Sequence, residues 1–458
     1  MSQSWSEVDV VPKPGHSWQG RRRAWPTLVP VLVAGTLVTC GLGFVQKLPC
    51  QQSQFDFGQM FQRACYTDIH KLYYERGLAA GNYPLKIEYP VLTGWFMQGT
   101  AMIARLVAGA DAARQGMAFY WVNVLALIVC ALLAVLATAY VAGRNGLRAG
   151  LMVALSPALL LAAYINWDLF AVALSALALA AWAKRRPAAA GVLLGLAISA
   201  KFYPLFFLGP LVLLCARAGQ WRALGRLMAA AATTWLVVNV PIMYVAWDDW
   251  VEFYSFSRRR PIDWGSIFYL PVRKNVPILD DPHLLNVICT GAFLVMALGI
   301  AVLALAAKRR PRLPQLLFLV VAAFLLSNKV WSPQYVLWLL PLAVLARPKL
   351  GAYLLWQAAE VAYFFGIWGY LDGAINGNGA GITEDDYFIP LVLRFSAVLL
   401  LAALVVWDIL NPHHDLVRRG GQDDPAGGVL DEAEDKFKIS LGSSEGKLII
   451  SRTQTAKR

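Results

Sequence analysis

The feature that most constrains this chain is the recurrence of apolar stretches between Trp25 and Leu410. These stretches are about 15 to 26 residues long, and short breaks containing Lys, Arg, Gly or Pro separate them. A transmembrane helix needs about 20 mostly apolar residues. The chain is 58% hydrophobic and only 15% charged, which is typical of a polytopic, all-α membrane protein rather than a soluble domain.

Basic clusters at the ends of the apolar stretches indicate the topology. Arg21, Arg22 and Arg23 hold the N-terminal segment, residues 1–24, in the cytoplasm under the positive-inside rule. If later clusters are also cytoplasmic, an even number of crossings separates neighbouring clusters. The segment 91–109 could cross the membrane, but a helix lying in the outer interface keeps every cluster inside, and we adopt that interpretation.

The predicted transmembrane domain covers residues 25–410. Its twelve crossings are 25–46, 117–142, 149–164, 168–183, 188–200, 202–216, 223–246, 283–307, 314–327, 333–346, 349–370 and 387–410. Two long loops, 47–116 and 247–282, then lie outside the cell, and both termini lie in the cytoplasm. The polar, Gly-rich tail, residues 411–458, is predicted to be mostly disordered.

The first outer loop carries the strongest candidate for chemistry. Asp68 lies among tyrosines next to the membrane, where a carboxylate can accept a proton from a substrate hydroxyl. Asp68 could instead cap a helix, a role that the neighbouring Thr67 could also fill. Cys50 and Cys65 in the same loop could form a disulfide or remain free thiols, and the sequence leaves both open.

Other polar side chains near the predicted outer face are candidate substrate-binding residues. Glu88 could bind a sugar hydroxyl or be a surface carboxylate, and the following Tyr89 is kept extended by Pro90. Asp168 could cap a helix, or hold an acceptor hydroxyl or a metal. Lys201 and Lys329 are isolated cations, which indicates either an anionic partner such as phosphate or snorkelling to lipid headgroups. The remaining candidates are Tyr203, Arg258, Arg259, Arg260 and Gln334.

Two further observations limit the possible chemistry. Glu360 and Arg394 fall at similar depths in two predicted spans, so we expect these charges to pair. The sequence contains no P-loop, dinucleotide fingerprint, CxxC or HExxH metal motif, or G-x-S-x-G elbow. A cytoplasmic mechanism driven by ATP or a nucleotide sugar therefore has no visible site.

Several short runs resemble a known family. They are CYTDI at 65–69, EYPVLTG at 88–94, NWD at 166–168, AKFYP at 200–204 and NKVWSPQY at 328–335. On these runs the chain is similar to the actinobacterial members of glycosyltransferase family 87, integral-membrane enzymes of the C-type glycosyltransferase superfamily. The resemblance covers about residues 25–410.

The resemblance implies a C-type fold with about twelve transmembrane helices and an inverting sugar transfer. The donor would be a polyprenyl-phosphate sugar on the outer side of the plasma membrane, and the acceptor a lipid-linked or glycan molecule of the cell envelope. Mannose is the expected sugar, with arabinofuranose as the alternative. The loop aspartate that acts as the base in the superfamily corresponds to Asp68. The paired acidic residues that the superfamily often has at the start of this loop are absent, because Thr67 precedes Asp68, and we expect no metal or other cofactor.

Two other function classes remain open. A transporter or flippase for a lipid-linked sugar would also need outer-face cations, although transporters usually show internal repeats and sites near the membrane midplane. A scaffold protein of an envelope-synthesis complex is the third class. The expected partners are membrane lipid, the donor and the acceptor. The net charge of +13 comes from clusters at span ends, so we expect no nucleic-acid partner.

Overall fold

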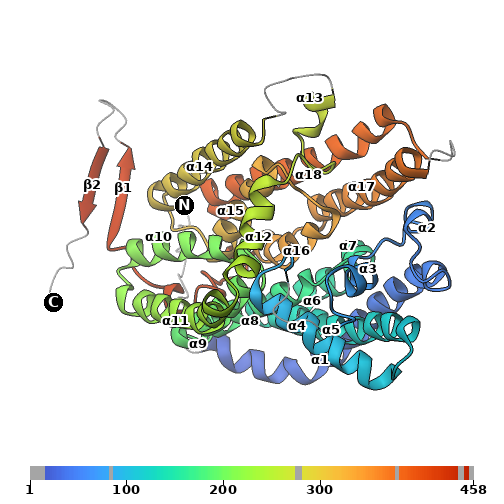
Figure 1. Cartoon of the computed structure of the whole chain (residues 1–458). Coiled ribbons are helices and arrows are strands. Elements are labelled where there is room, and N and C mark those ends of the chain that lie inside the picture. The colour runs from blue at the N-terminus through green and yellow to red at the C-terminus, as the bar shows by residue number, and fades with distance from the viewer. Residues whose placement is uncertain (1–15, 82–85, 274–280, 377–380, 442–447, 453–458) are drawn as a thin grey trace, which may run out of the picture.

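The structure is a computed structural model that describes residues 16–81, 86–273, 281–376, 381–441 and 448–452. Helices make up most of the described chain, and a two-stranded antiparallel sheet lies beside the helical body (Figure 1). The predicted all-α class is therefore confirmed for the membrane domain. Residues 1–15 of the predicted N-terminal segment lie outside the described residues.

Six of the described helices are long and apolar enough to cross a membrane. They are α1 (His16–Gln51), α5 (Ala112–Val141), α11 (Trp221–Val245), α14 (Pro282–Ala306), α17 (Leu350–Asn376) and α18 (Glu384–Leu410). Each overlaps one predicted crossing. Only a small share of α11 and α14 is buried inside the protein, which fits helices whose apolar side chains face lipid.

Five shorter apolar segments correspond to five more of the predicted crossings. They are α8 (Asp168–Ala183), α9 (Pro187–Ala200), η2 with α10 (Tyr203–Phe207 and Leu208–Ala218), α15 (Leu313–Ser327), and η4 with α16 (Pro333–Tyr335 and Val336–Ala346). Nearly every residue of α15 and α16 is buried, so these helices form the centre of the domain. The total of twelve crossings stays a prediction.

The predicted crossing at 149–164 is two short helices instead of one. α6 (Gly146–Ala154) ends before Ser156, and α7 (Pro157–Ala162) begins directly after it. Pro157 has no N–H to continue α6, and it disfavours helical geometry at the preceding residue. The Ser156 side chain accepts from the Leu159 N–H and donates to Gln357 at 2.6 Å. These bonds satisfy polar groups that the break leaves inside the protein.

Both long loops contain helices. The first holds α2 (Phe57–Gln62), α3 (Asp68–Glu75) and α4 (Val91–Ala108), and the second holds α12 (Trp247–Arg259) and α13 (Tyr269–Arg273). α4 coincides with the segment that we interpret as interfacial, and that location stays a prediction. α2 packs on α17 and α3 packs on α5, so the loop carrying Asp68 is fixed to two long helices (Figure 1).

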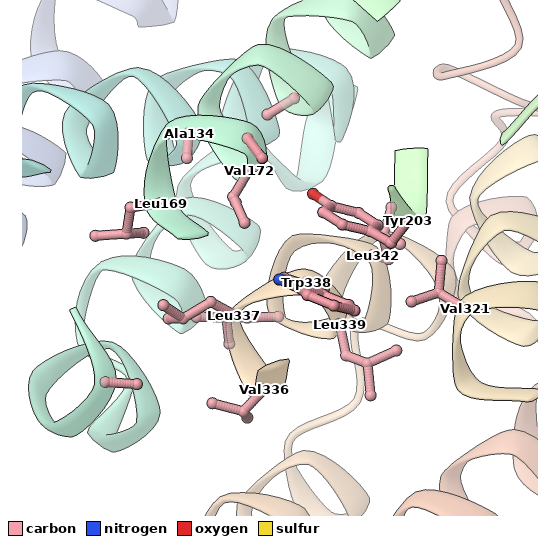
Figure 2. Packing of buried hydrophobic residues seen from close by; sticks show 14 of the residues in the cluster. Ala134, Leu169, Val172, Tyr203, Val321, Val336, Leu337, Trp338, Leu339 and Leu342 are labelled. Atoms are coloured by element: carbon pink, nitrogen blue, oxygen red, sulfur yellow. The ribbon is translucent and has the colours of Figure 1, made fainter. Parts of the chain in front are cut away.

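Close packing of the helices depends on small and aromatic residues. A Cβ atom at Gly191 would lie 2.3 Å from the Leu227 carbonyl oxygen of α11, so only glycine allows α9 and α11 to approach this closely. Figure 2 shows the Tyr203 ring beside that of Trp338. Their centroids are 4.6 Å apart and the rings are nearly parallel, which is a favourable aromatic geometry.

The predicted pairing of Glu360 with Arg394 is confirmed. The Arg394 Nε atom lies 3.0 Å from a Glu360 oxygen, and both side chains are buried. Arg394 also donates to the Trp331 carbonyl at 2.8 Å and to the Ser332 carbonyl at 3.1 Å. The pair therefore joins α17 and α18 to the segment between α15 and η4.

The C-terminal tail differs from the prediction of disorder. Its described part forms η5 (Pro412–His414), α19 (Leu416–Arg419), η6 (Gly428–Leu430), β1 (Phe437–Leu441) and β2 (Leu448–Arg452). Gly428 has φ +61°, and a Cβ there would lie 2.1 Å from the Trp182 carbonyl oxygen. The backbone of the tail thus lies directly against the end of α8, where no larger residue fits.

Ion pairs explain why the described part of the tail is ordered. Asp415 pairs with Arg312 at 2.7 Å, and Asp435 pairs with Arg217 at 2.7 Å and with Arg310 at 2.6 Å. We call the three arginines the arginine socket. Their side chains are 9% exposed or less. The sequence shows these residues as topology-setting clusters, and nothing in its local pattern indicates carboxylate partners more than 100 residues away.

Candidate active site

The local fold leaves the Asp68 side chain free for chemistry. Thr67, not Asp68, is the N-cap of α3: its hydroxyl accepts from the Ile69 N–H at 3.2 Å and donates to the Tyr164 carbonyl at 2.7 Å. The Asp68 N–H donates to the Ile165 carbonyl at 2.8 Å. Both residues are therefore anchored through the segment that follows α7, and the capping role considered for Asp68 is filled by its neighbour.

Two further links fix the loop to the end of α1. Cys50 and Cys65 form a disulfide with their Cα atoms 6.2 Å apart, which resolves the alternative that the sequence leaves open. The Lys47 ammonium donates to the Tyr66 carbonyl at 2.8 Å. These links hold the chain on the N-terminal side of Asp68, so its carboxylate has a defined place.

The Asp68 carboxylate accepts hydrogen bonds from two tyrosines. The Tyr66 hydroxyl donates to Oδ1 at 2.6 Å, and the Tyr89 hydroxyl donates to Oδ2 at 3.4 Å. Burial raises the pKa of Asp68 to about 6, although the Tyr66 hydrogen bond acts in the opposite direction. The carboxylate is then mostly ionised at neutral pH, and its basicity exceeds that of an exposed aspartate.

Asp68 faces a cavity of about 630 Å³. The cavity lies among α3, α12, α17 and the segment between α15 and η4. The predicted site residues that line it are Asp68, Glu88, Tyr89, Lys201, Tyr203, Arg260, Lys329 and Gln334. The structure thus brings together residues that lie up to 266 positions apart in the chain (Asp68 to Gln334). Asp168, Arg258 and Arg259 are not among the lining residues.

Lys201 is already paired in this structure. Its ammonium lies 2.6 Å from Asp168 Oδ1, and the Trp338 indole donates to Oδ2 at 2.9 Å. The ammonium also lies 4.9 Å above the Tyr89 ring and 5.5 Å from that of Tyr335, a cation–π arrangement. Asp168 therefore compensates the charge of Lys201, for which the sequence leaves phosphate binding and snorkelling open, and this buried pair joins α8 to the end of α9.

Lys329 acts on the backbone of the second loop. Its ammonium donates to the Arg258 carbonyl at 3.0 Å and to the Arg260 carbonyl at 2.5 Å, where a cation is favourable at the C-terminal end of α12. The Arg259 side chain is 68% exposed and pairs with Glu252 at 3.3 Å. Only Arg260 of the three successive arginines has a side chain that lines the cavity.

Arg260 is the cation best placed for an anionic ligand. Its side chain is one third exposed, and its nearest carboxylate is Asp263 at 3.6 Å, a looser pair than that of Lys201. Asp263 is held by the Ser332 hydroxyl at 3.0 Å and lines the same cavity. Glu88 pairs with Arg76 at 2.9 Å, so its carboxylate is partly compensated within the first loop.

Several lining residues were not candidates from the sequence. Asp263 follows the arginine run and stands out only through its pairing, while Tyr363 and Trp368 lie in an apolar helix, where aromatic residues usually indicate packing. No group of three or more His, Cys, Asp or Glu side chains in the described ranges is placed to hold a metal ion. Independence from metals stays a prediction.

A comparison with family models decides the classification. The model of glycosyltransferase family 87 matches residues 99–328, half of the 458-residue chain. The chain belongs to glycosyltransferase family 87. This family 87 protein is thus a glycosyltransferase, and its apolar helices indicate that it lies in a membrane. Curated proteins give no match to the chain.

The family 87 match covers one part of the cavity. It includes Lys201, Arg260 and Asp263, and it ends at Asn328, directly before Lys329. Asp68 lies before the matched range, so its role depends on the geometry of the cavity.

Proposed function

We propose that this protein transfers a sugar, mannose, from a polyprenyl-phosphate donor to a hydroxyl of a lipid-linked or glycan acceptor in cell-envelope synthesis. The observation that carries the proposal is one cavity that holds a carboxylate base and an accessible guanidinium. Asp68 can accept the acceptor proton, and Arg260 can bind the donor phosphate. Arabinofuranose is the alternative sugar.

The proposed reaction is a direct displacement. The acceptor oxygen attacks the anomeric carbon from the face opposite the phosphate, and the new C–O bond forms as the bond to the phosphate oxygen breaks. The phosphate leaves with the electron pair, and the acceptor proton passes to Asp68. A single displacement inverts the anomeric configuration. Arg260 stabilises the negative charge that develops on the leaving phosphate.

The apolar side of the cavity supports a lipid-linked donor. Beyond the polar centre, the cavity continues between α12, α14 and α15. Its lining there includes Phe253, Phe256, Cys289 and Phe324. α14 is largely unburied, so a prenyl chain lying in this part of the cavity could extend into lipid. A soluble sugar phosphate would gain nothing from these side chains.

The proposed orientation follows from the arrangement of charge. The cavity lies at one end of α15 and the arginine socket at the other. With the basic clusters in the cytoplasm, the cavity faces the outside of the plasma membrane and both termini lie inside. Polyprenyl-phosphate sugars on the outer leaflet would then reach the cavity laterally.

A transfer assay tests the proposal. Purified protein in detergent is given radiolabelled polyprenyl-phosphate mannose and a crude envelope lipid extract as acceptor. We expect labelled product from the wild type and at least a hundredfold less from Asp68→Asn, since removal of a general base typically costs about 10² to 10⁴ in rate. The amide keeps the size of the side chain, so folding should be retained.

Asp111→Asn is the matched control. Asp111 is an exposed N-cap of α5 that bonds the Arg114 N–H at 3.1 Å, and asparagine caps helices equally well. This variant should transfer sugar at the wild-type rate. If mannose gives no product, the same assay with polyprenyl-phosphate arabinose tests the alternative sugar. Bound donor without transfer of either sugar would contradict the proposal and favour a flippase or scaffold.

A further inference from the structure

Asn166 begins a hydrogen-bonded chain that ends on the candidate base. The backbone N–H of Asp168 donates to Asn166 Oδ1 at 3.0 Å. A backbone N–H can only donate, so this bond fixes the orientation of the Asn166 amide and directs its nitrogen the other way. That nitrogen donates to the Tyr89 hydroxyl oxygen at 3.2 Å.

The direction of every bond in the chain is therefore determined. The Tyr89 oxygen accepts from Asn166, which leaves its own proton to be donated to Asp68 Oδ2, 3.4 Å away. Tyr66 donates to Oδ1 at 2.6 Å. Each oxygen of the ionised carboxylate has about two acceptor sites. The two tyrosines occupy one site on each oxygen and leave the others for a substrate.

The rings that carry these hydroxyls are held in place. The Tyr66 ring stacks on Trp368 with centroids 4.7 Å apart. The Tyr89 ring meets Trp167 edge-on at 5.4 Å, and the Lys201 ammonium lies above it at 4.9 Å. Asn166 itself is only 2% exposed. None of the three groups can rotate away without losing buried contacts.

We propose that Tyr66, Tyr89 and Asn166 are positioning residues that orient the Asp68 carboxylate toward the acceptor hydroxyl and favour its ionised form. The acceptor hydroxyl in this proposal rests on the proposed function, whereas the hydrogen-bonded chain does not. Two residues of the NWD run at 166–168 thus act at the site. Asn166 orients the base through Tyr89, and Asp168 pairs with Lys201.

Substitutions of Tyr66, Tyr89 or Asn166 leave the charged groups near Asp68 in place. Glu88 raises the pKa of Asp68, and Lys201 and Arg260 lower it. Removing the Tyr66 hydroxyl removes a donor to the ionised form, so the pKa should rise from about 6. A higher pKa leaves more of the carboxyl group protonated at pH 7, and the acid limb of the rate profile then moves to higher pH.

The test compares Tyr66→Phe, Tyr89→Phe and Asn166→Ala with the control Tyr74→Phe. Tyr74 is an exposed α3 residue whose hydroxyl donates to the Ala112 carbonyl at 2.9 Å, away from Asp68. Infrared titration of the Asp68 carboxyl band, identified by its loss in Asp68→Asn, needs no substrate. We expect an upward shift of about one pH unit for Tyr66→Phe, the size expected for one hydrogen bond to a charged group.

The 3.4 Å bond from Tyr89 should change the pKa of Asp68 less than the bond from Tyr66 does. Tyr89 and Asn166 should act as one unit, because Asn166 reaches Asp68 through Tyr89. Tyr89→Phe and Asn166→Ala should give equal, smaller upward shifts, and the double variant should shift no further than Tyr89→Phe alone. The control should not shift. An unmoved carboxyl band in Tyr66→Phe, or full additivity of the Asn166 and Tyr89 changes, would overturn the inference.

The transfer assay separates this inference from the proposed function. If the wild type transfers sugar, the acid limb of its rate profile should lie near pH 6, where Asp68 titrates, and each variant should move that limb by the shift of its carboxyl band. If the wild type transfers no sugar but the Asp68 carboxyl band shifts as expected in the variants, the proposed function would be contradicted and the positioning role would still be supported.

Discussion

The cationic side chains that line the cavity differ in the protein groups to which they are already bound. Lys201 is held by a buried carboxylate at 2.6 Å, and Lys329 is held by two carbonyls at the end of α12. Arg260 has one carboxylate at 3.6 Å and remains a third exposed. A ligand phosphate would have to break strong bonds to engage the lysines fully, whereas Arg260 can bind it while keeping Asp263 nearby.

Arg260→Met should therefore lower kcat/KM for the donor about tenfold or more, since the loss of a charge-assisted contact of about 1.4 kcal/mol corresponds to a factor of ten. Arg259→Met is the matched control, because the neighbouring arginine is 68% exposed and pairs with Glu252. Donor titrations of both variants check this. Equal losses from the two changes would show that general positive charge, not a specific contact, recruits the donor.

At the residue scale, local sequence could indicate Asp68 but not its partners. A carboxylate among tyrosines in a polar loop stands out in any reading of the chain. The pairing of Lys201 with Asp168, and of Arg260 with Asp263, depends on how short helices end and turn in space. Lys329 is an isolated cation in the sequence, which fits either phosphate binding or snorkelling to lipid headgroups, and its actual bonds to backbone carbonyls carry no sequence signal.

At the scale of elements, the loop that carries Asp68 behaves as part of the helical domain. α2 packs on α17 and α3 on α5, and the Cys50–Cys65 disulfide joins the loop to the end of α1. Short helices of six and eight residues have little stability of their own. Their order therefore comes from these tertiary contacts and from the covalent link.

Replacing Cys50 and Cys65 together by alanine should loosen this loop. Cross-linking over a separation of 15 residues stabilises by about 3 kcal/mol through the entropy of the unfolded loop. We expect faster hydrogen exchange at residues 51–75 and a lower transfer rate. Cys130→Ala, which removes a buried free thiol of α5, should leave exchange in the loop unchanged. Unaltered exchange in the double variant would mean that packing alone holds the loop.

The apolar helices could be predicted from the sequence, whereas the break within one of the predicted crossings could not. Eleven of the twelve predicted crossings coincide with continuous apolar segments (six long and five short), because the signal needs only composition and length. The break between α6 and α7 was missed, since Ser156 and Pro157 lie inside an apolar run. The long-range bond from Ser156 to Gln357 is what makes that break tolerable in the protein interior.

At the scale of the whole molecule, α15 joins two charged regions. Its 15 residues span about 22 Å at 1.5 Å per residue. Arg312 of the arginine socket precedes its first residue, and Lys329 of the cavity follows Asn328 at its end. The tail carboxylates therefore stabilise one end of the helix whose other end lines the site. A composition-based prediction of disorder could not detect pairing between such distant residues.

Asp415→Ala should destabilise the protein strongly. Both Asp415 and Arg312 have side chains only 2% exposed, and leaving one buried charge unpaired costs about 3–5 kcal/mol. Glu75→Ala is the matched change at a surface pair. Glu75 lies 3.6 Å from Lys71, and both side chains are at least a third exposed, so the loss of this pair should cost about 1 kcal/mol or less. Thermal unfolding in detergent compares the two variants, and similar midpoints would contradict the buried-pair explanation.

The arginine socket also has a consequence for the order of synthesis. Arg217, Arg310 and Arg312 are made long before Asp415 and Asp435, because a chain is synthesised from its N-terminus. Until the last part of the chain emerges, these guanidiniums lack the carboxylates that balance them. A prematurely terminated product would thus reach the membrane with most of its helices and an incomplete socket. A product that stops before Asp415 would therefore differ from the longer chain in the charge balance of the socket and not only in its length.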